Sequence, residues 1–579
     1  MLRSRWIDGL WLLAFGLASS AWCLTAAAEL GATFDEPLYL NAGLTSWRTG
    51  SNKLLMSAGT MPLPVDVQTL PIYLWERSRG QEFHAYRDIA TILPVARAAN
   101  LVFWWMLLIY AMRLGRTWGG TWGGRLAVGF IACEPNFLGH AALATTDIAL
   151  VVTMLALVYH FHHGQGMGWG RRVVVPGIFF GLAILAKASG LVFGVQAMLV
   201  LGLCHLANNG ALFAPAGSRV APCFQPVSVS SRWLNCTGWK HGATLKHFWH
   251  VTFPLRKDLI WIGLIGFTFA FAYTGSDWGT EWTFIEWANK LPEGMLRSTM
   301  VPLSENLSIF PNAGEALLQQ VKHNLRGHGA YLLGEWHQKS YWAYFPIALT
   351  VKTPVPVLAL LLAVVLIRPG SLRSPLAGIV LLLLAFSLNC KVQIGIRFMF
   401  TLMALLNIAL AVAVARSWND PEGGRYVPRW FVGVLLAAMA AVSIWIWPHG
   451  IGFTNQLWGG TEDGYHHLSD SNYDWGQGLP ELKEWNRTHN GDATLAIAYF
   501  GTDPAILFAP FKPISLHHAL VTGSPEELRR LAGTRYLAVS TSVLYGNESE
   551  RLGHMTALVR LRSARPAGRT QTFLIFDLD

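Results

Sequence analysis

The sequence predicts an α-helical multi-pass membrane protein of about eleven transmembrane helices, followed by a small C-terminal α/β domain outside the membrane. Of its 579 residues, 52% are hydrophobic and only 13% are charged, whereas a soluble domain carries about 25% charged residues. The mean hydropathy is +0.35, and the 26 tryptophans suit a chain that crosses membrane–water interfaces repeatedly. Most of the surface is therefore expected to face lipid.

The formal charge of +10 does not predict nucleic-acid binding, because the Lys and Arg residues form short clusters between apolar runs. The six cysteines contain no CxxC pair, so a zinc or thiol-redox motif is not indicated. No cofactor is predicted. A divalent metal is compatible with the acidic residues, but no His/Cys ligand spacing indicates a metal site.

The first apolar run follows Arg3 and Arg5 and precedes three alanines, 26–28, that resemble a signal-peptidase site. We expect a retained helix, because the run and its flanks approach the ~20 residues that span a bilayer. Either reading places the chain from Gly31 onward outside the cytoplasm. The spans are expected near 9–29, 92–112, 124–140, 144–161, 173–187, 189–206, 259–275, 346–367, 375–390, 396–415 and 430–447.

Basic residues cluster in the loops on one side of the membrane if these spans alternate. They are Arg113, Arg116, Arg125, Arg171, Arg172, Arg219, Arg232, Lys240, Lys246, Arg256, Lys257, Arg368, Arg373, Arg416, Arg425 and Arg429. The positive-inside rule makes that side the cytoplasm. The expected location is the inner (plasma) membrane, with a cytoplasmic N-terminus and an extracytoplasmic C-terminal domain.

Three large segments then lie outside the cytoplasm. Residues 1–447 form the predicted transmembrane domain, which includes external loops at 30–91 and 276–345, and residues 448–579 form the predicted α/β domain. In that domain 493–500, 536–542 and 572–577 are expected to be strands. Ser524, Pro525 and Glu527 form a capping box that predicts a helix through Leu531.

Two adjacent acids, Asp35 and Glu36, follow the first span almost at once. A carboxylate just outside a bilayer can supply a general base. The alternative is a solvated pair of loop acids. His140 and Asp147 bracket the short external turn between the third and fourth spans. Asp147 can simply complement a helix dipole, but it is predicted to lie at the same membrane face as Asp35.

Three cations are placed at or near that outer face: Lys187, Lys352 and Arg397. Buried cations are costly without an anionic partner, so they suggest function; the alternative is snorkelling to the interface. Together with His140 and Asp147, these cations are candidate substrate-binding residues. Cations and acids that converge on one face favour an anionic lipid headgroup handled beside a base.

Eight segments form an ordered set: FDEP at 34–37, EPNFLGH at 134–140, ATTD at 144–147, LAKASG at 185–190, HGAYLL at 328–333, 341–354, QIGIR at 393–397 and DSNYDWGQ at 470–477. In these segments the chain resembles the GT-C membrane glycosyltransferases, and within them the family 39 branch related to bacterial protein O-mannosyltransferases and aminoarabinose transferases. The segments come in the family's order and cover about 30–490. The chain departs from the family pattern at 61–64, Phe398 and Gly478, which affects the acceptor and the shape of the donor site.

The resemblance implies a cell-envelope enzyme that takes a sugar from a polyprenyl-phosphate-linked donor and transfers it, with inversion, to a hydroxyl acceptor outside the cytoplasm. Asp35 matches the catalytic acid position, with Glu36 beside it. The acceptor can be an envelope glycan, a lipid or a protein, and membrane lipids are further partners. A lipid-linked-sugar flippase or transporter is the alternative, although its binding residues would be expected near the midplane with an internal repeat. A non-catalytic assembly scaffold is a third reading.

Overall fold

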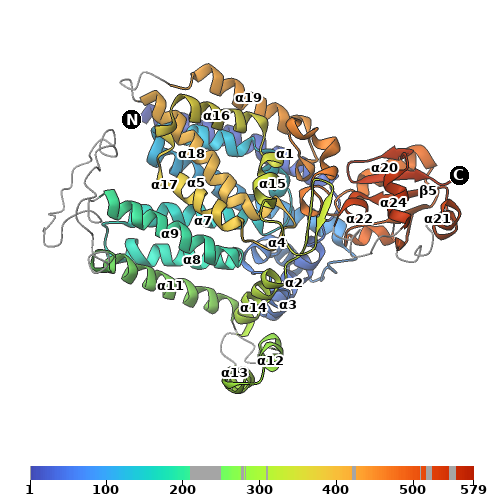
Figure 1. Ribbon diagram of the computed structural model, residues 1–579, viewed down its shortest axis with the longest axis horizontal. Helices are drawn as coiled ribbons and strands as arrows, with labels where there is room; N and C mark the ends of the chain where they lie inside the picture. Colours follow the sequence, from blue (N-terminus) through green and yellow to red (C-terminus); the bar gives the residue numbers. More distant parts are fainter. Residues whose placement is uncertain are drawn as a thin grey trace.

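The structure is a computed structural model that describes residues 2–208, 249–275, 280, 282–307, 311–419, 426–508, 510–516, 524–546 and 556–579. Its helices form an elongated body, and a smaller unit of strands and helices lies at one end of that body (Figure 1). Five basic residues used to predict the orientation lie outside the described residues, namely Arg219, Arg232, Lys240, Lys246 and Arg425.

Long helices of the body run roughly along its long axis (Figure 1). They are α1 (Leu2–Glu29), α5 (Ile89–Ala132), α7 (Asp147–Gly164), α8 (Val175–Ala186), α9 (Ser189–Asn208), α11 (Phe253–Thr274), α16 (Val355–Ile367), α17 (Pro375–Ser387), α18 (Phe400–Asn419) and α19 (Arg429–Trp445). Shorter helices are α2 (Glu36–Thr49), α3 (Lys53–Ser57), α4 (Leu63–Arg79), α6 (Pro135–Ala141), α12 (Trp282–Asn289), α13 (Met295–Asn306), α14 (Pro311–Arg326) and α15 (Tyr344–Lys352). The multi-pass helical fold class is therefore as predicted.

The number of spans stays a prediction. Four of the described helices are long and apolar enough to cross a membrane, or five if α15 and α16 count as one bent span. The expected second and third spans are joined in α5, which bends at Gly120, where φ is 65°. The expected single span 346–367 is interrupted, since α15 and α16 meet at 107°. Pro354 explains the break, because proline removes a backbone donor and disfavours helix at the residue before it.

Basic residues of α5 and α18 form polar contacts, and those of α5 pair with Asp8 at the start of α1. Asp8 pairs with Arg116, and its other oxygen lies 2.8 Å from Nε of Arg125. Arg416 donates to the carbonyl of Arg373 at 2.9 Å. The end of the body that holds the start of α1 is opposite to the C-terminal unit (Figure 1); the membrane orientation that the basic residues predict stays a prediction.

The C-terminal unit is built on a five-stranded sheet in the order β4-β3-β5-β7-β6. Its strands are β3 (Leu495–Ala498), β4 (Phe511–Pro513), β5 (Tyr536–Ser540), β6 (Gly568–Arg569) and β7 (Phe573–Asp577), with helices α20 (Leu479–Asn490), α21 (Pro525–Ala532), α22 (Thr541–Tyr545) and α24 (Thr556–Ser563). β3 is parallel to β4 and β5, and β7 is antiparallel to β5 and β6. Apolar side chains from alternate strand positions form a core on each face. The predicted cap of α21 is present, since Ser524 Oγ accepts the Glu527 N–H at 3.2 Å.

A short hairpin joins the two parts of the molecule. Its strands β1 (Ala330–Leu332) and β2 (Glu335–His337) pair antiparallel. Leu332 also forms a bridge with Leu468 of the C-terminal segment. The hairpin therefore lies against the segment that leads into the α/β unit, and both border the site described next.

Candidate active site

Two cavities meet at Asp35 and Arg397. The larger, of about 1010 Å³, is lined by the hairpin, by the loop at 470–475 and by the edge of the α/β unit. The smaller, of about 450 Å³, is lined by the turn between α8 and α9, by α14 and by residues that precede α18. Asp35, Ile394 and Arg397 line both cavities. The wall between the cavities is therefore made of an acid and a guanidinium.

The charged side chains in this wall and directly behind it form pairs of opposite charge. Arg397 Nη1 lies 3.2 Å from Asp35 Oδ2 and 3.8 Å from Asp147 Oδ2. Lys187 Nζ lies 2.6 Å from the other oxygen of Asp147. The side chain of Asp35 is 25% exposed, whereas that of Asp147 is fully buried. The structure thus brings together four predicted site residues, and Asp147 holds two cations in place while Asp35 faces the cavities.

Local structure positions the two wall residues. Asp35 precedes α2, whose first turn contains Pro37, and accepts a 3.3 Å hydrogen bond from the Tyr39 hydroxyl. Arg397 lies in the 3₁₀ turn that opens α18. Its guanidinium lies over the ring of Trp475, 4.0 Å from the centroid. A cation held over an indole and between two carboxylates keeps a fixed direction.

Glu36 does not reach either cavity. Its carboxylate is buried and pairs with Arg97, with Oε2 to Nη2 at 2.7 Å. It also accepts hydrogen bonds from backbone N–H groups of Thr33 and Ala144, both at 2.8 Å. Burial raises the pKa of Glu36, but the Arg97 charge and these bonds outweigh it and hold the pKa below its ordinary value. Glu36 therefore fastens α2 to α5, and its predicted contact with substrate has no support from this geometry.

Lys352 also points away from the cavities. Its ammonium donates to the carbonyl oxygens of Ile451 at 2.8 Å and Asn472 at 2.7 Å. These carbonyls take up the ammonium, so the expected contact with a phosphate has no support from this geometry and stays a prediction. His140 is buried behind the wall, with Nδ1 3.8 Å from Asp147 Oδ2 and its ring against Phe400. It lines neither cavity.

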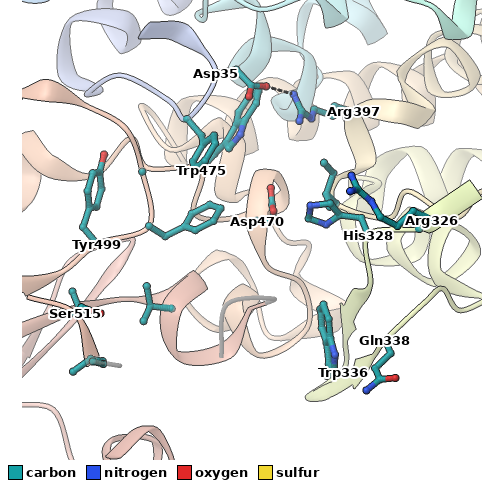
Figure 2. Close-up of a pocket in the computed structure, with 18 of the residues that line it drawn as sticks. Asp35, Arg326, His328, Trp336, Gln338, Arg397, Asp470, Trp475, Tyr499 and Ser515 are labelled. Carbon is teal, nitrogen blue, oxygen red and sulfur yellow. Dashed lines mark hydrogen bonds and ion pairs between the residues drawn. The ribbon is translucent and has the colours of Figure 1, made fainter. Parts of the chain in front are cut away.

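Asp470 is a residue of this site to which the sequence analysis assigned no role. It lines the larger cavity, and in Figure 2 it is drawn below the Asp35–Arg397 pair, to the left of His328. Its φ is 58°, in the left-handed region that costs energy for a side chain other than glycine. Burial raises the pKa of Asp470 to about 7, although the Arg397 charge opposes the rise. The available signal was the DSNYDWGQ segment itself, which holds two acids.

The second acid of that segment, Asp474, fastens the loop to the α/β unit. Its Oδ2 accepts hydrogen bonds from the Ser540 hydroxyl and, at 3.1 Å, from the Ser542 N–H. Ser542 Oγ donates to the Asp474 carbonyl at 2.9 Å. The end of β5 thus holds the loop that carries Asp470 and Trp475.

Several buried polar atoms around the wall lack a hydrogen-bond partner among the described residues. They include Arg397 Nε, Asp147 Oδ2 and His140 Nδ1. Such atoms are rare in protein interiors and gather at sites that bind something polar. In the described part of the chain, no group of three or more His, Cys, Asp or Glu side chains is placed to hold a metal ion.

Neither a family model nor a curated protein matches this sequence. Among solved structures the chain is similar to ArnT from Cupriavidus metallidurans bound to undecaprenyl phosphate, with 12% identity over 98% of each chain and a TM-score of 0.43. The apo state of that protein gives a TM-score of 0.30 at the same identity and coverage. The Archaeoglobus fulgidus oligosaccharyltransferase, in complex with Zn and sulfate, matches with 10% identity over 92% of this chain and 68% of that chain, and a TM-score of 0.41. All three likenesses have TM-scores under 0.5 at 10–12% identity, so the reaction of this chain has to be inferred from the site itself.

Proposed function

We propose that this protein is a glycosyltransferase that moves a sugar from a polyprenyl-phosphate-linked donor to a hydroxyl acceptor, with inversion, on the outer face of the membrane. The observation that carries the proposal is the wall of Asp35 and Arg397, which separates a mainly apolar cavity between helices from a more polar cavity beside the α/β unit. A lipid-linked donor would reach Asp35 through one cavity, and a water-soluble or interfacial acceptor would reach it through the other.

The smaller cavity suits the donor. Apolar side chains such as Val192, Phe193 and Phe386 line it, together with Lys187 and Arg397. Apolar side chains favour an isoprenoid chain, and the cations stabilise the phosphate as it departs as an anion. The phosphate ligands that we propose are therefore Lys187 and Arg397, with Asp147 holding both cations.

Asp35 is the proposed base. Its carboxylate takes the proton from the acceptor hydroxyl while the acceptor oxygen bonds to the anomeric carbon. The bond between that carbon and the phosphate oxygen breaks, and polyprenyl phosphate leaves with the electron pair. One displacement of this kind needs one base and inverts the anomeric configuration.

The proposal includes a membrane orientation, because the sugar of the donor and the α/β unit have to lie on the same side of the membrane. We place the N-terminus in the cytoplasm and the C-terminal unit outside, in the inner membrane. A reporter fused after Asp579 that is active only outside the cytoplasm tests this placement. Activity of a cytoplasmic reporter at that position would contradict it.

The function is tested with purified protein and polyprenyl-phosphate hexoses in detergent. Asp35→Asn is expected to lower turnover by about 10²- to 10⁴-fold, the usual contribution of a general base. Glu82→Gln is the matched control, since Glu82 is an exposed acid of the same external segment. Turnover near the unmodified level in folded Asp35→Asn protein, or a product with retained configuration, would refute the mechanism. Lipid translocation without sugar transfer would favour a flippase.

A further inference from the structure

The larger cavity is built mainly by segments outside the helices that cross the membrane. The α/β unit contributes Tyr499 and Phe500, and the hairpin contributes Trp336. Its volume of about 1010 Å³ is at the upper end of the ~300–1,000 Å³ typical of small-molecule sites. The cavity therefore has room for a ligand of a few rings.

Aromatic rings flank the part of this cavity next to Asp35. Phe34 and Phe500 stack with centroids 5.5 Å apart and planes 26° apart. Trp475 lies on the same side, and its ring supports Arg397. Aromatic faces offer flat apolar surface at little cost in conformational entropy, which suits the C–H faces of sugar rings.

Asp470 adds a second carboxylate to the cavity that Asp35 faces. One of its oxygens accepts the Ser471 N–H at 2.6 Å, and the other accepts no hydrogen bond from a residue that the structure describes. The backbone of Asp470 is held in its left-handed conformation partly by its own N–H, which donates to Ser542 Oγ at 3.1 Å. Strain of this kind persists where surrounding structure enforces it, and it gathers at functional sites.

We propose that this cavity binds a saccharide acceptor, and that Asp470 holds one acceptor hydroxyl while Asp35 faces another. The proposal rests on the proposed function and names its acceptor class. A serine, a threonine or a lipid alcohol offers one hydroxyl, whereas two carboxylates on one cavity match the neighbouring hydroxyls of a sugar. The aromatic faces match the rest of the ring.

Binding is tested without donor, by saturation-transfer NMR on the full chain in detergent. The probes are trisaccharides of the gluco, galacto and manno series, a blocked tripeptide with a central threonine, and a short-chain diacylglycerol. At least one trisaccharide is expected to receive saturation, and the peptide none. Asp470→Asn and Phe500→Ala are each expected to weaken saccharide binding at least tenfold.

Two matched variants serve as controls. Asp463→Asn changes an exposed acid of the same segment, and Phe508→Ala changes an exposed phenylalanine of the α/β unit; both are expected to bind the saccharide unchanged. Asparagine tolerates a left-handed φ, so Asp470→Asn is expected to fold. Failure of every trisaccharide to bind, stronger binding of the peptide or the diacylglycerol, or unaltered binding by Asp470→Asn would overturn the proposal. Slow hydrolysis of the lipid-linked donor by water needs no saccharide acceptor, so it tests the proposed function alone. Failure of the acceptor proposal can therefore be told apart from failure of the proposed function.

Discussion

The two cavities that meet at Asp35 and Arg397 are built in different ways. The smaller is bordered largely by helices and by the turns that join them, and most of its lining surface is apolar. The larger gathers residues from the chain near Phe34, the hairpin, the loop at 470–475 and the α/β unit. The cavity that we propose for the donor thus follows from helix packing, whereas the cavity that we propose for the acceptor depends on long-range assembly. A mutation that affects only one cavity is therefore expected to leave binding in the other cavity unchanged.

The largest expected effect comes from Glu36→Gln, which loosens the wall common to both cavities. The change leaves the Arg97 guanidinium buried without its carboxylate, which typically costs about 3–5 kcal/mol. We expect a large fall in melting temperature and in yield of folded protein, measured in detergent by fluorescence. Glu29→Gln, at an exposed acid that ends α1, is expected to have little effect. A stable Glu36→Gln protein with no activity would instead place Glu36 in the chemistry.

Arg397→Met should impair both sides at once. Arg397 faces both cavities and pairs with both Asp35 and Asp147. Loss of one donor that stabilises developing charge usually lowers kcat by about 10²- to 10³-fold. Steady-state kinetics with a lipid-linked hexose would measure it. An effect limited to acceptor KM would show that Arg397 does not meet the departing phosphate.

Lys187→Met should affect the donor side alone. Lys187 lines the smaller cavity and not the larger one. Removing a cation that faces a phosphate is expected to cost about 2 kcal/mol, or roughly thirtyfold in donor affinity. Titration with a polyprenyl-phosphate hexose measures this loss, and trisaccharide binding should stay unchanged. Lys352→Met is the contrast, since its ammonium is held by backbone carbonyls; equal losses of donor affinity in both variants would contradict the separation.

The smallest expected effect is a pH dependence confined to the acceptor side. Asp470 has a pKa raised to about 7 by burial, and Arg397, Asp35 and Asp474 contribute charge around it. As pH falls from about 8 to about 6 its carboxylate becomes protonated, so saccharide affinity should fall by up to about tenfold. His328 also lines the cavity. If Asp470 causes the pH dependence of saccharide affinity, the Asp470→Asn variant should lose it, which distinguishes Asp470 from His328 as the cause.

The same pKa has a consequence for stability. A carboxyl whose pKa is raised in the folded protein favours folding at low pH, and that contribution is lost as pH rises through about 7. Asp470→Asn is therefore expected to melt higher than the unmodified protein at about pH 8, with a smaller difference at about pH 6. An identical difference at both values would contradict the assignment.

Residue type and position at the ends of apolar runs were enough to predict that Asp35, Asp147, Lys187 and Arg397 come together. They do so because the ends of several helices meet there, and their role in catalysis or binding stays a proposal. The same information could not tell which way a side chain turns. Lys352 has the same charge as Lys187 and lies in a neighbouring motif, but carbonyl groups of distant segments hold its ammonium.

The acceptor side was harder to predict for a physical reason. Asp470 is an acid in a polar loop, and acids in loops are usually solvated. Its proposed role rests on a left-handed backbone and on its place in a cavity between segments far apart in the chain, neither of which has a local sequence signal. The strands β3, β5 and β7 and the cap of α21 were predictable because alternation and capping are local. Pro354 indicates the break between α15 and α16, which the hydropathy of the sequence alone does not predict.

The link between Asp474 and the end of β5 has a consequence for how the enzyme matures. The loop that supports Arg397 through Trp475 is held by Ser540 and Ser542. Those residues follow the helical body in the chain and, on the proposed orientation, must be exported before they fold. Newly inserted helices thus have no finished site until the C-terminal unit has folded against them. If the proposed function holds, a half-made chain is therefore unable to consume the lipid-linked sugar.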